Sequence, residues 1–345
     1  MSEKVRFGIG AMFPNMPDYL PWVREVERAG FDLAGYGDTQ SILPDALVAL
    51  TAMAMETDRI RLCPTVSNPV TRHPAVMASA MGAIQQLSGG RASFGIGTGD
   101  SALLNIGERP SRVAELAEYV NAFRSLVSGE VATYRGHELQ LQWETPPVEI
   151  IVAADGPRMM HLAGQIADGV FFANGLSDEI IEDNIRRVRA GAESVGRTID
   201  DIEMWWLTKI YFAESEEQGW YEAAYSLAAS ANHSFRFNLE GKFVPPEHEA
   251  AIARIQLEYA AHQHNLVDKS DHNRALVVDG GLSEFLGRRF LIAGSESEIQ
   301  ARVREIADLG ARNLFIPSLF GDPLGYAAQI AKSILPAFLN SGATP

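Results

Sequence analysis

The chain has 345 residues, of which 46% are hydrophobic and 21% charged, and its formal net charge is -15. This composition excludes a largely disordered chain, and the negative charge argues against nucleic acid or anionic lipid as a partner. A single cysteine excludes an internal disulfide or a thiolate metal cluster. No apolar run approaches the ~20 residues that cross a bilayer, so we expect a cytoplasmic protein without a membrane segment.

Strands and helices alternate along almost the whole chain. Each predicted strand is an apolar run that passes into a loop of small and polar residues, and each predicted helix has apolar residues at helical spacing. The predicted strands are 5–11, 31–37, 60–66, 92–96, 148–155, 169–175, 202–213 and 311–319. The predicted helices are 18–29, 45–56, 75–87, 112–128, 158–167, 178–193, 214–230 and 323–339, and residues 131–143 have hairpin character.

Eight strands with helices between them predict a single (β/α)8 TIM barrel over residues 1–345. An open, doubly wound sheet is the competing fold. The barrel is favoured because its strand count fits, and because residues 7–10 lack the third glycine and the downstream acidic partner of a dinucleotide-binding fingerprint. Cys63 falls inside the third predicted strand, where we expect it to be a small apolar core residue.

Residues 231–289 interrupt the alternation between the seventh and eighth strands. An insertion of this size usually covers the active-site face of a barrel, so we expect it to form a lid. It holds five of the eight histidines, namely His233, His248, His262, His264 and His272. His262 and His264 are two residues apart and would point to different sides of a helix. A solvated, partly mobile lid is therefore predicted rather than a metal site.

Several segments in a fixed order carry a resemblance to a known family. They are TVSNP at 65–69, TRHP at 71–74, GGR at 89–91, GIGTGDS at 95–101 and AADGP at 153–157. Together they resemble the bacterial luciferase-like superfamily, and within it the branch of deazaflavin-dependent methylenetetrahydromethanopterin reductases and glucose-6-phosphate dehydrogenases. The resemblance covers nearly the whole chain. It implies a barrel that binds FMN or the deazaflavin coenzyme F420 without a separate dinucleotide-binding domain.

The resemblance also implies which residues hold the cofactor. Thr65–Val66 matches the site of a non-prolyl cis peptide that supports the flavin ring, and the next two residues would hydrogen-bond to the polar edge of that ring. Glycine-bearing helix starts are natural anion sites, so we expect the cofactor phosphate at two of them. The predicted cofactor-binding residues are Thr65, Val66, Ser67, Asn68, Gly99, Gly156, Arg158, Asn174 and Gly175.

Two carboxylates are the predicted catalytic residues. Asp38 matches a position where family members place an acidic residue near the reactive ring, and Asp100 matches a carboxylate proposed as proton donor in deazaflavin enzymes. At neighbouring strand tips they could act as acid and base if burial separates their pKa values. The alternatives are a capping or turn role for Asp38 and the capping of a short helix by Asp100.

Three further residues are predicted to contact substrate. Met12 and Phe13 lie just past the first strand and are apolar. Thr39 occupies the position where many relatives carry a histidine that serves as acid or base, so this position cannot act here as an imidazole. The resemblance also implies a homodimer through the helices after strands two and three, with an apolar face supplied by Met53, Met55, Met77 and Met81.

Three functions follow from these observations. In the first, reduced FMN from a separate flavin reductase reacts with oxygen, and the protein is a monooxygenase of a small organic substrate. In the second, bound coenzyme F420 exchanges a hydride with a substrate carbon. The motifs favour the second, whereas Thr39 and the wide use of FMN in the superfamily favour the first, which ranks slightly ahead. A flavin-binding protein without turnover is the remote third, because the polar strand-tip residues are all present.

Overall fold

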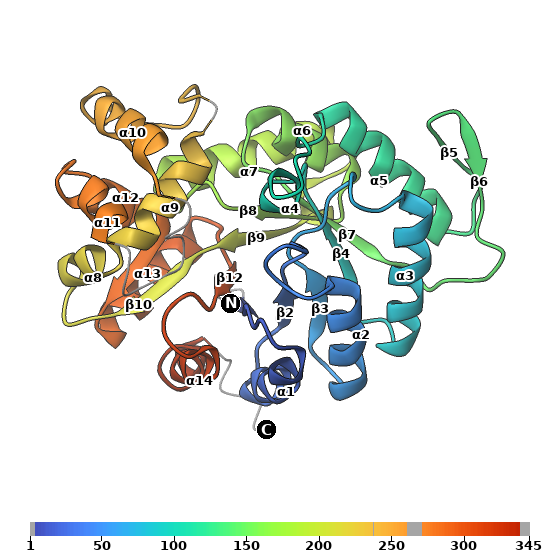
Figure 1. The fold of residues 1–345 in the computed structure, drawn as a ribbon, viewed down its shortest axis with the longest axis horizontal. Helices are drawn as coiled ribbons and strands as arrows, with labels where there is room; N and C mark the ends of the chain where they lie inside the picture. The colour runs from blue at the N-terminus through green and yellow to red at the C-terminus, as the bar shows by residue number, and fades with distance from the viewer. Residues whose placement is uncertain (1–3, 237, 261–270, 339–345) are drawn as a thin grey trace.

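Eight parallel strands form the centre of the computed structural model, which describes residues 4–236, 238–260 and 271–338 (Figure 1). Their order in the sheet is β3-β2-β1-β12-β9-β8-β7-β4. Their bounds are Arg6–Gly10 (β1), Leu33–Tyr36 (β2), Arg61–Pro64 (β3), Ser93–Ile96 (β4), Glu149–Ala153 (β7), Gly169–Phe172 (β8), Glu203–Leu207 (β9) and Asn313–Pro317 (β12). Backbone bridges from Leu62 to Ala92 and from Ser67 to Ile96 join β3 to β4. The sheet therefore closes on itself, which confirms the predicted (β/α)8 barrel and excludes the open sheet.

Side chains fill the interior of the barrel. One buried cluster comes from six of the strands and consists of Leu33, Cys63, Ile151, Phe171, Trp205 and Phe315. Glycine makes room for the largest of these rings, because a Cβ at Gly35 would lie 2.5 Å from the ring of Phe315. Burial raises the pKa of the Cys63 thiol to about 12. Cys63 is thus a small apolar core residue, as the sequence predicts.

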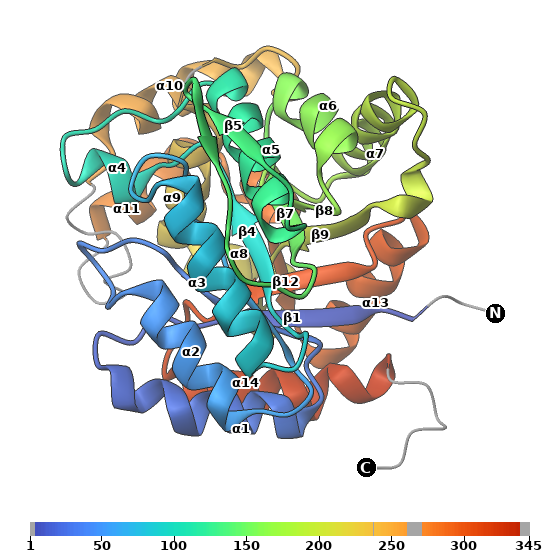
Figure 2. The same ribbon diagram turned by 90° about the vertical axis from the view of Figure 1, so that its right-hand side faces the viewer.

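Helices cover the outside of the barrel. In α1 the buried residues Tyr19, Trp22, Val23 and Val26 recur at helical spacing, which gives the helix one apolar face against the strands. The outer helices are α1 (Tyr19–Ala29), α2 (Ala46–Glu56), α3 (Pro74–Leu87), α5 (Val113–Val127), α6 (Pro157–Ile166), α7 (Asp178–Glu193), α13 (Glu296–Asp308) and α14 (Pro323–Ser333). Helices α1, α2 and α3 lie side by side (Figure 2).

Shorter elements complete the covering. They are α4 (Ser101–Leu104), the 3-10 turns Met16–Asp18, Ile199–Asp201 and Leu335–Ala337, and the strands β5 (Ala132–Tyr134) and β6 (His137–Leu139). β5 and β6 pair antiparallel, which confirms the predicted hairpin, and they project beside α5 (Figure 1). Among the described residues, no helix combines the length and the apolar composition that a membrane crossing requires.

The GGR segment of the family resemblance has a structural role. The guanidinium of Arg91 donates hydrogen bonds to the backbone carbonyls of Ala54, Thr57, Ile60 and Ser88, at 2.6 to 3.2 Å. These carbonyls lie at the end of α2, before β3 and after α3. Arg91 therefore ties together three elements on the outside of the barrel, far from the loops that follow the strands.

The predicted seventh strand, residues 202–213, is wrong as a single strand. The chain leaves the barrel at the buried residue Thr208, so that β9 ends at Leu207 and β10 (Lys209–Phe212) begins a second sheet. β10 pairs in parallel with β11 (Leu291–Gly294), a strand that the sequence analysis did not identify. A continuous apolar run does not mark the point where a strand changes partner, because both sheets are buried.

The insertion begins directly after β10 rather than at residue 231, because the predicted helix 214–230 is two helices that belong to it. The whole insertion is helical and has its own apolar core. Its helices are α8 (Glu216–Glu222), α9 (Ala224–Phe235), α10 (Pro246–Glu258), α11 (Asp271–Val278) and α12 (Ser283–Phe290). They gather on one side of the barrel (Figure 1), around a cluster that includes Leu227, Ile255 and Leu286. A predominantly solvated insertion is therefore a wrong prediction, because these helices bury apolar faces against one another. His262 and His264 lie outside the described residues, and the role of the insertion as a lid stays a prediction.

The methionines expected to form a dimer face are mostly internal. Met53, Met77 and Met81 are fully buried, and only Met55, 66% exposed, reaches the surface. Residues two apart on a helix point about 200° apart, so that Met53 faces the barrel where Met55 faces outward. The prediction is wrong for three of the four. The exposed apolar side chains of α2 and α3 are Val48, Met55, Val76 and Leu87.

Candidate active site

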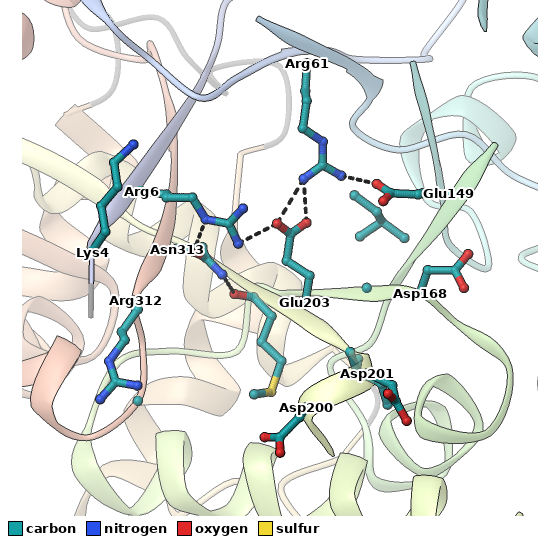
Figure 3. Close-up of a pocket in the computed structure, with 15 residues that line it drawn as sticks. Lys4, Arg6, Arg61, Glu149, Asp168, Asp200, Asp201, Glu203, Arg312 and Asn313 are labelled. Carbon is teal, nitrogen blue, oxygen red and sulfur yellow. Dashed lines mark hydrogen bonds and ion pairs between the residues drawn. The ribbon is translucent and has the colours of Figure 1, made fainter. Parts of the chain in front are cut away.

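A cavity of about 640 Å³ lies at the amino-terminal end of the barrel, among residues at the starts of strands (Figure 3). The guanidinium of Arg61 donates to both carboxylate oxygens of Glu203, at 2.9 and 2.7 Å, and to Glu149 at 2.7 Å. Glu203 also pairs with Arg6 and accepts a hydrogen bond from Trp205 Nε1. These opposite charges neutralise one another. Because this end of a TIM barrel contributes stability, whereas catalytic groups follow the carboxyl ends of the strands, the cavity is not the candidate active site.

Asp38 lies at the carboxyl end of β2 and is buried. Its Oδ2 accepts hydrogen bonds from Ser67 Oγ and from Arg72 Nη1, both at 2.6 Å, and Arg72 also donates to Asp45 at 2.7 Å. The side chains of Asp38 and Arg72 are 4% and 16% exposed. A capping or turn role for Asp38 is therefore wrong, because its carboxylate forms a buried ion pair that joins the loops after β2 and β3. Its catalytic role stays a prediction.

The loop after β3 carries the residues predicted to bind the ring. The Thr65–Val66 peptide bond is cis, as the resemblance implies. The hydroxyl of Ser67 donates a hydrogen bond to Asp38. Asn68 is 1% exposed, and its Oδ1 accepts from the backbone N–H groups of Val70 and Thr71, both at 2.9 Å. Asn68 Nδ2 is buried and has no hydrogen-bond partner among the described residues, which is unusual for a buried amide.

Asp100 follows β4 and contacts the insertion. Its Oδ2 lies 2.8 Å from Nδ1 of His233 and its Oδ1 lies 2.5 Å from Nη1 of Arg236, both on or directly after α9. Nε2 of His233 lies 3.6 Å from Oδ2 of Asp155, which follows β7. Asp100 occupies the N-cap position of α4, but its side chain makes no cap hydrogen bond, so the capping alternative is wrong. Asp38 and Asp100 are not on neighbouring strands, because β3 lies between β2 and β4.

Helix α9, which carries His233, is anchored to the second sheet by a buried lysine. Lys209, at the start of β10, donates from Nζ to the carbonyl and hydroxyl of Ser226 and to the hydroxyl of Ser230, at 2.7 to 2.8 Å. Burial lowers the pKa of Lys209 to about 7. These three bonds fix the position from which α9 reaches the loops after β4 and β7.

The contact between α9 and Asp100 makes stability depend on pH. The hydrogen bond to Asp100 and the neighbouring Asp155 carboxylate, opposed by burial, raise the pKa of His233 from 6.5 to about 9. The stabilisation of the folded state by protonated His233 is therefore present in full below about pH 6.5 and is lost as the pH rises through about 9. Although burial opposes it, the hydrogen bonds from His233 and Arg236 lower the pKa of Asp100 from 3.8 to about 2, so its contribution is lost only as the pH falls through that value.

We therefore expect the melting temperature of the wild-type protein to fall more steeply between about pH 6.5 and 9 than that of His233→Gln. The variant has no titrating imidazole at position 233. Circular dichroism melts across this range measure both slopes. The replacement His248→Gln is the control, because His248 is also in the insertion but stacks on Phe285, whereas the partners of Asp100 are His233 and Arg236. Equal slopes for the wild type and His233→Gln would contradict the expectation.

The two expected phosphate positions differ in the structure. Gly156 is the N-cap of α6 and no side chain caps that helix, so its first N–H groups, including that of Arg158, are open to an anion. Asn174 pairs both ways with Asn184, at 2.9 Å each. Helix α7 begins at Asp178, beyond Asn174 and Gly175, so this segment is not a helix start. The expectation of a helix start there is wrong, because the chain runs on to Ser177 before turning helical.

A buried arginine lies against this second segment. Arg289, at the end of α12, donates to the carbonyls of Asn174 at 2.9 Å and Lys242 at 2.6 Å, and is 2% exposed. A Cβ at Gly175, where φ is +130°, would meet Arg289 at 2.6 Å. Burial lowers the pKa of Arg289 to about 10. Gly175 is thus required by the close approach of the insertion.

The predicted substrate-contact residues follow β1 and β2. Met12 is 39% exposed. The ring of Phe13 packs on Tyr19 of α1 with 4.8 Å between centroids, so it is directed toward α1. Oγ1 of Thr39 lies 3.2 Å from Oγ of Ser101. Gly99, with φ at +99°, lies beside Leu103 of α4 and lets the chain turn before Asp100.

Sequence reasoning assigned no role to Arg236, Asp155 or Arg289, and it placed His233 in a solvated lid after weighing a metal site. His233 and Arg236 are three residues apart, which places them on one face of a helix, and this spacing was the available signal. Nothing in the sequence connected them to Asp100, more than 130 residues earlier. Among the described residues, no group of three or more His, Cys, Asp or Glu is arranged to hold a metal ion.

Known proteins resemble this chain over most of its length. The family model described as luciferase-like monooxygenase matches residues 6–313. A 5,10-methylenetetrahydromethanopterin reductase of Methanolobus tindarius is 26% identical, over 88% of this chain and 90% of its own. An F420-dependent glucose-6-phosphate dehydrogenase of Nakamurella multipartita is 26% identical, over 85% of this chain and 82% of its own. The structure of the coenzyme F420-dependent tetrahydromethanopterin reductase from Methanopyrus kandleri superposes with a TM-score of 0.76, at 21% identity, over 97% of this chain and 100% of that one.

Proposed function

Because this chain belongs to the luciferase-like monooxygenase family, we propose that it transfers a hydride between bound coenzyme F420 and a carbon atom of a small organic substrate. The deazaflavin supplies or accepts the hydride when bound. The protein's residues hold the ring, hold the phosphate and move the accompanying proton. The substrate class is a carbonyl, an imine or the corresponding reduced compound, since these are the groups that exchange a hydride together with a proton.

The unpartnered amide of Asn68 carries the proposal for a flavin-type ring at this place. Leaving a buried N–H donor without an acceptor costs about 1–3 kcal/mol, which a carbonyl oxygen on the edge of the ring would offset. The residue lies two positions after the Thr65–Val66 cis peptide. The uncapped start of α6 at Gly156 offers N–H groups to the phosphate. The residues present therefore fit the cofactor at both ends.

The choice of F420 over FMN rests on the relatives. FMN and F420 offer the same polar ring edge to Asn68, so this contact does not distinguish them. The two relatives described above are named for methylenetetrahydromethanopterin reduction and for F420-dependent glucose-6-phosphate oxidation. Their names favour F420, although the sequence alone ranked FMN slightly ahead. One argument for FMN was the absence of a histidine at Thr39, and His233 now places an imidazole among the strand-tip residues.

Asn68→Asp tests the contact with the ring. The carboxylate keeps an acceptor for the N–H groups of Val70 and Thr71 but has no N–H to donate. We expect the dissociation constant for F420 to rise about tenfold or more, since an unpaired buried group costs about 1–3 kcal/mol. Fluorescence titration measures it. Asn68→Ala, which also loses the loop bonds, is the comparison for stability, and unchanged affinity in Asn68→Asp would remove this residue from the ring site.

Equilibrium titration of the wild type with F420, FMN and anaerobically reduced FMN tests the choice of cofactor. Selective binding of F420, followed by oxidation of its reduced form by a panel of aldehydes, ketones and imines, is the expected result. Binding of reduced FMN alone would instead support the second candidate, a monooxygenase supplied by a separate flavin reductase. That candidate is favoured by the family description and by Thr39. Binding without turnover would support the remote third, a non-catalytic flavin-binding protein.

The homodimer and the lid belong to the same proposal. Val48 and Met55 on α2, with Val76 and Leu87 on α3, are exposed apolar side chains on helices that lie side by side. We propose that these residues, in place of the buried methionines, contribute to a dimer interface. The insertion is proposed to cover the carboxyl end of the barrel, because α9 already contacts the loops after β4 and β7 through His233.

A further inference from the structure

The polar cluster formed by Asp100, Asp155, His233 and Arg236 brings three parts of the chain together. Asp100 follows β4, Asp155 follows β7, and the other two lie at the end of α9 in the insertion. These positions are at the carboxyl ends of strands, where a barrel places its reacting groups. The side chain of His233 is 47% exposed, so it remains accessible to solvent.

The two nitrogens of His233 have different surroundings. Nδ1 lies 2.8 Å from Asp100, a normal hydrogen-bond distance, and Asp100 is held in turn by Arg236. Nε2 lies 3.6 Å from Asp155, which is too long for a hydrogen bond. Nδ1 is therefore the hydrogen-bonded nitrogen, whereas Nε2 has only the longer ion-pair contact with Asp155 and keeps its N–H for a substrate atom or a water molecule.

The charges oppose a proton-donor role for Asp100 itself. Its carboxylate is bonded to two cationic partners, and its pKa is lowered to about 2, so it carries no proton to donate at neutral pH. His233 has the complementary property. The Asp100 hydrogen bond and the nearby Asp155 carboxylate together raise its pKa to about 9, so it carries a proton at neutral pH. The other charged groups near this cluster are Lys242 and Arg289, which interact with Asp155.

We propose that Nε2 of His233 is the proton donor to the substrate and that Asp100 and Arg236 are positioning residues for it, an inference that rests on the proposed hydride transfer. As the substrate carbon receives its hydride from the reduced deazaflavin, the Nε2–H bond breaks and the proton passes to the attached oxygen or nitrogen. The neutral imidazole regains a proton from solvent. In the oxidative direction the same nitrogen accepts the proton. Position 39 has no imidazole in this chain, and His233 on α9 would provide one instead.

The first test needs no cofactor. Nuclear magnetic resonance titration of the ligand-free protein, with the His233 signal assigned by its loss in His233→Gln, measures the pKa of this imidazole. A value well above 6.5 that falls in Asp100→Asn is expected. A value at or below 6.5 would overturn the inference, because the imidazole would then be largely neutral at pH 7.

The second test compares F420 binding with turnover. With whichever carbonyl the wild type reduces, kcat of His233→Gln is expected to fall about 100-fold or more, because general acids contribute about 10²- to 10⁴-fold. The dissociation constant for F420, from fluorescence titration, is expected to stay close to the wild-type value, since the donor acts on substrate. His248→Gln is the matched control and is expected to keep wild-type kcat.

The pH profile separates proton donation from a structural role. In Asp155→Asn the imidazole remains but loses a neighbouring negative charge, so the alkaline fall in kcat is expected to move to lower pH while kcat at low pH is kept. Wild-type kcat in His233→Gln, or an unmoved profile in Asp155→Asn, would overturn the inference while leaving hydride transfer intact. Failure of the wild type to bind F420 would instead overturn the proposed function, and the inference with it.

Discussion

Replacing Glu203 with glutamine is expected to lower the free energy of unfolding by about 3 kcal/mol or more. The carboxylate is 18% exposed, and its two oxygens accept hydrogen bonds from Nη1 of Arg61, at 2.9 and 2.7 Å. It also pairs with Arg6 and accepts a hydrogen bond from Trp205 Nε1. A neutral amide leaves two guanidinium groups without their shared counter-charge at the amino-terminal end of the barrel (Figure 3). Urea unfolding followed by circular dichroism measures the change.

Glu149→Gln is the matched control for that prediction. Glu149 pairs with the same Arg61, but its side chain is 63% exposed, so we expect its loss to cost less than about 1 kcal/mol. Similar losses in the two variants would show that burial does not distinguish the two ion pairs. A loss of F420 binding in Glu203→Gln at a temperature where the variant is folded would contradict the assignment of this cavity to stability.

Gly95→Ala is expected to destabilise the protein by about 3 kcal/mol, at the upper end of the usual cost of overpacking. A Cβ there would lie 2.1 Å from the backbone oxygen of Pro64, so β3 and β4 must move apart. The carbonyl of Gly95 also accepts a hydrogen bond from Ser67 N–H at 2.9 Å. We therefore expect weaker F420 binding as well, because the loop that precedes Asn68 loses its support.

Gly97→Ala is the control for Gly95→Ala. Its Cβ would meet only side-chain atoms of Val66 and Ala153, at 3.2 and 3.3 Å, which shift more easily than backbone. Thermal melts and F420 titration of both variants separate the two cases. Equal stability of Gly95→Ala and the wild type would mean that β3 and β4 can separate without cost, and would contradict the close approach that closes the barrel.

The candidate site was partly readable from the sequence. Residues that follow a strand lie at its carboxyl end wherever the strand ends, so Asp38, Asn68 and Asp100 could be placed at the mouth of the barrel from the order of the motifs. Their partners could not be read in this way. Asp38 meets Arg72 and Ser67, and Asp100 meets His233, only after the strands close and α9 docks. The proposed role of Asp100 changed from proton donor to positioning residue because of these partners, whereas the catalytic role of Asp38 stays a prediction.

The sequence by itself determined the eight barrel strands, the outer helices and the loops that follow each strand, because apolar periodicity and small turn residues are local properties. Only the tertiary structure decided which partner a buried segment takes. It moved β10 out of the barrel to pair with β11, turned Met53 inward, and brought His233 to Asp100. These outcomes depend on contacts between residues far apart in the chain, and such contacts leave no periodic signal in either segment.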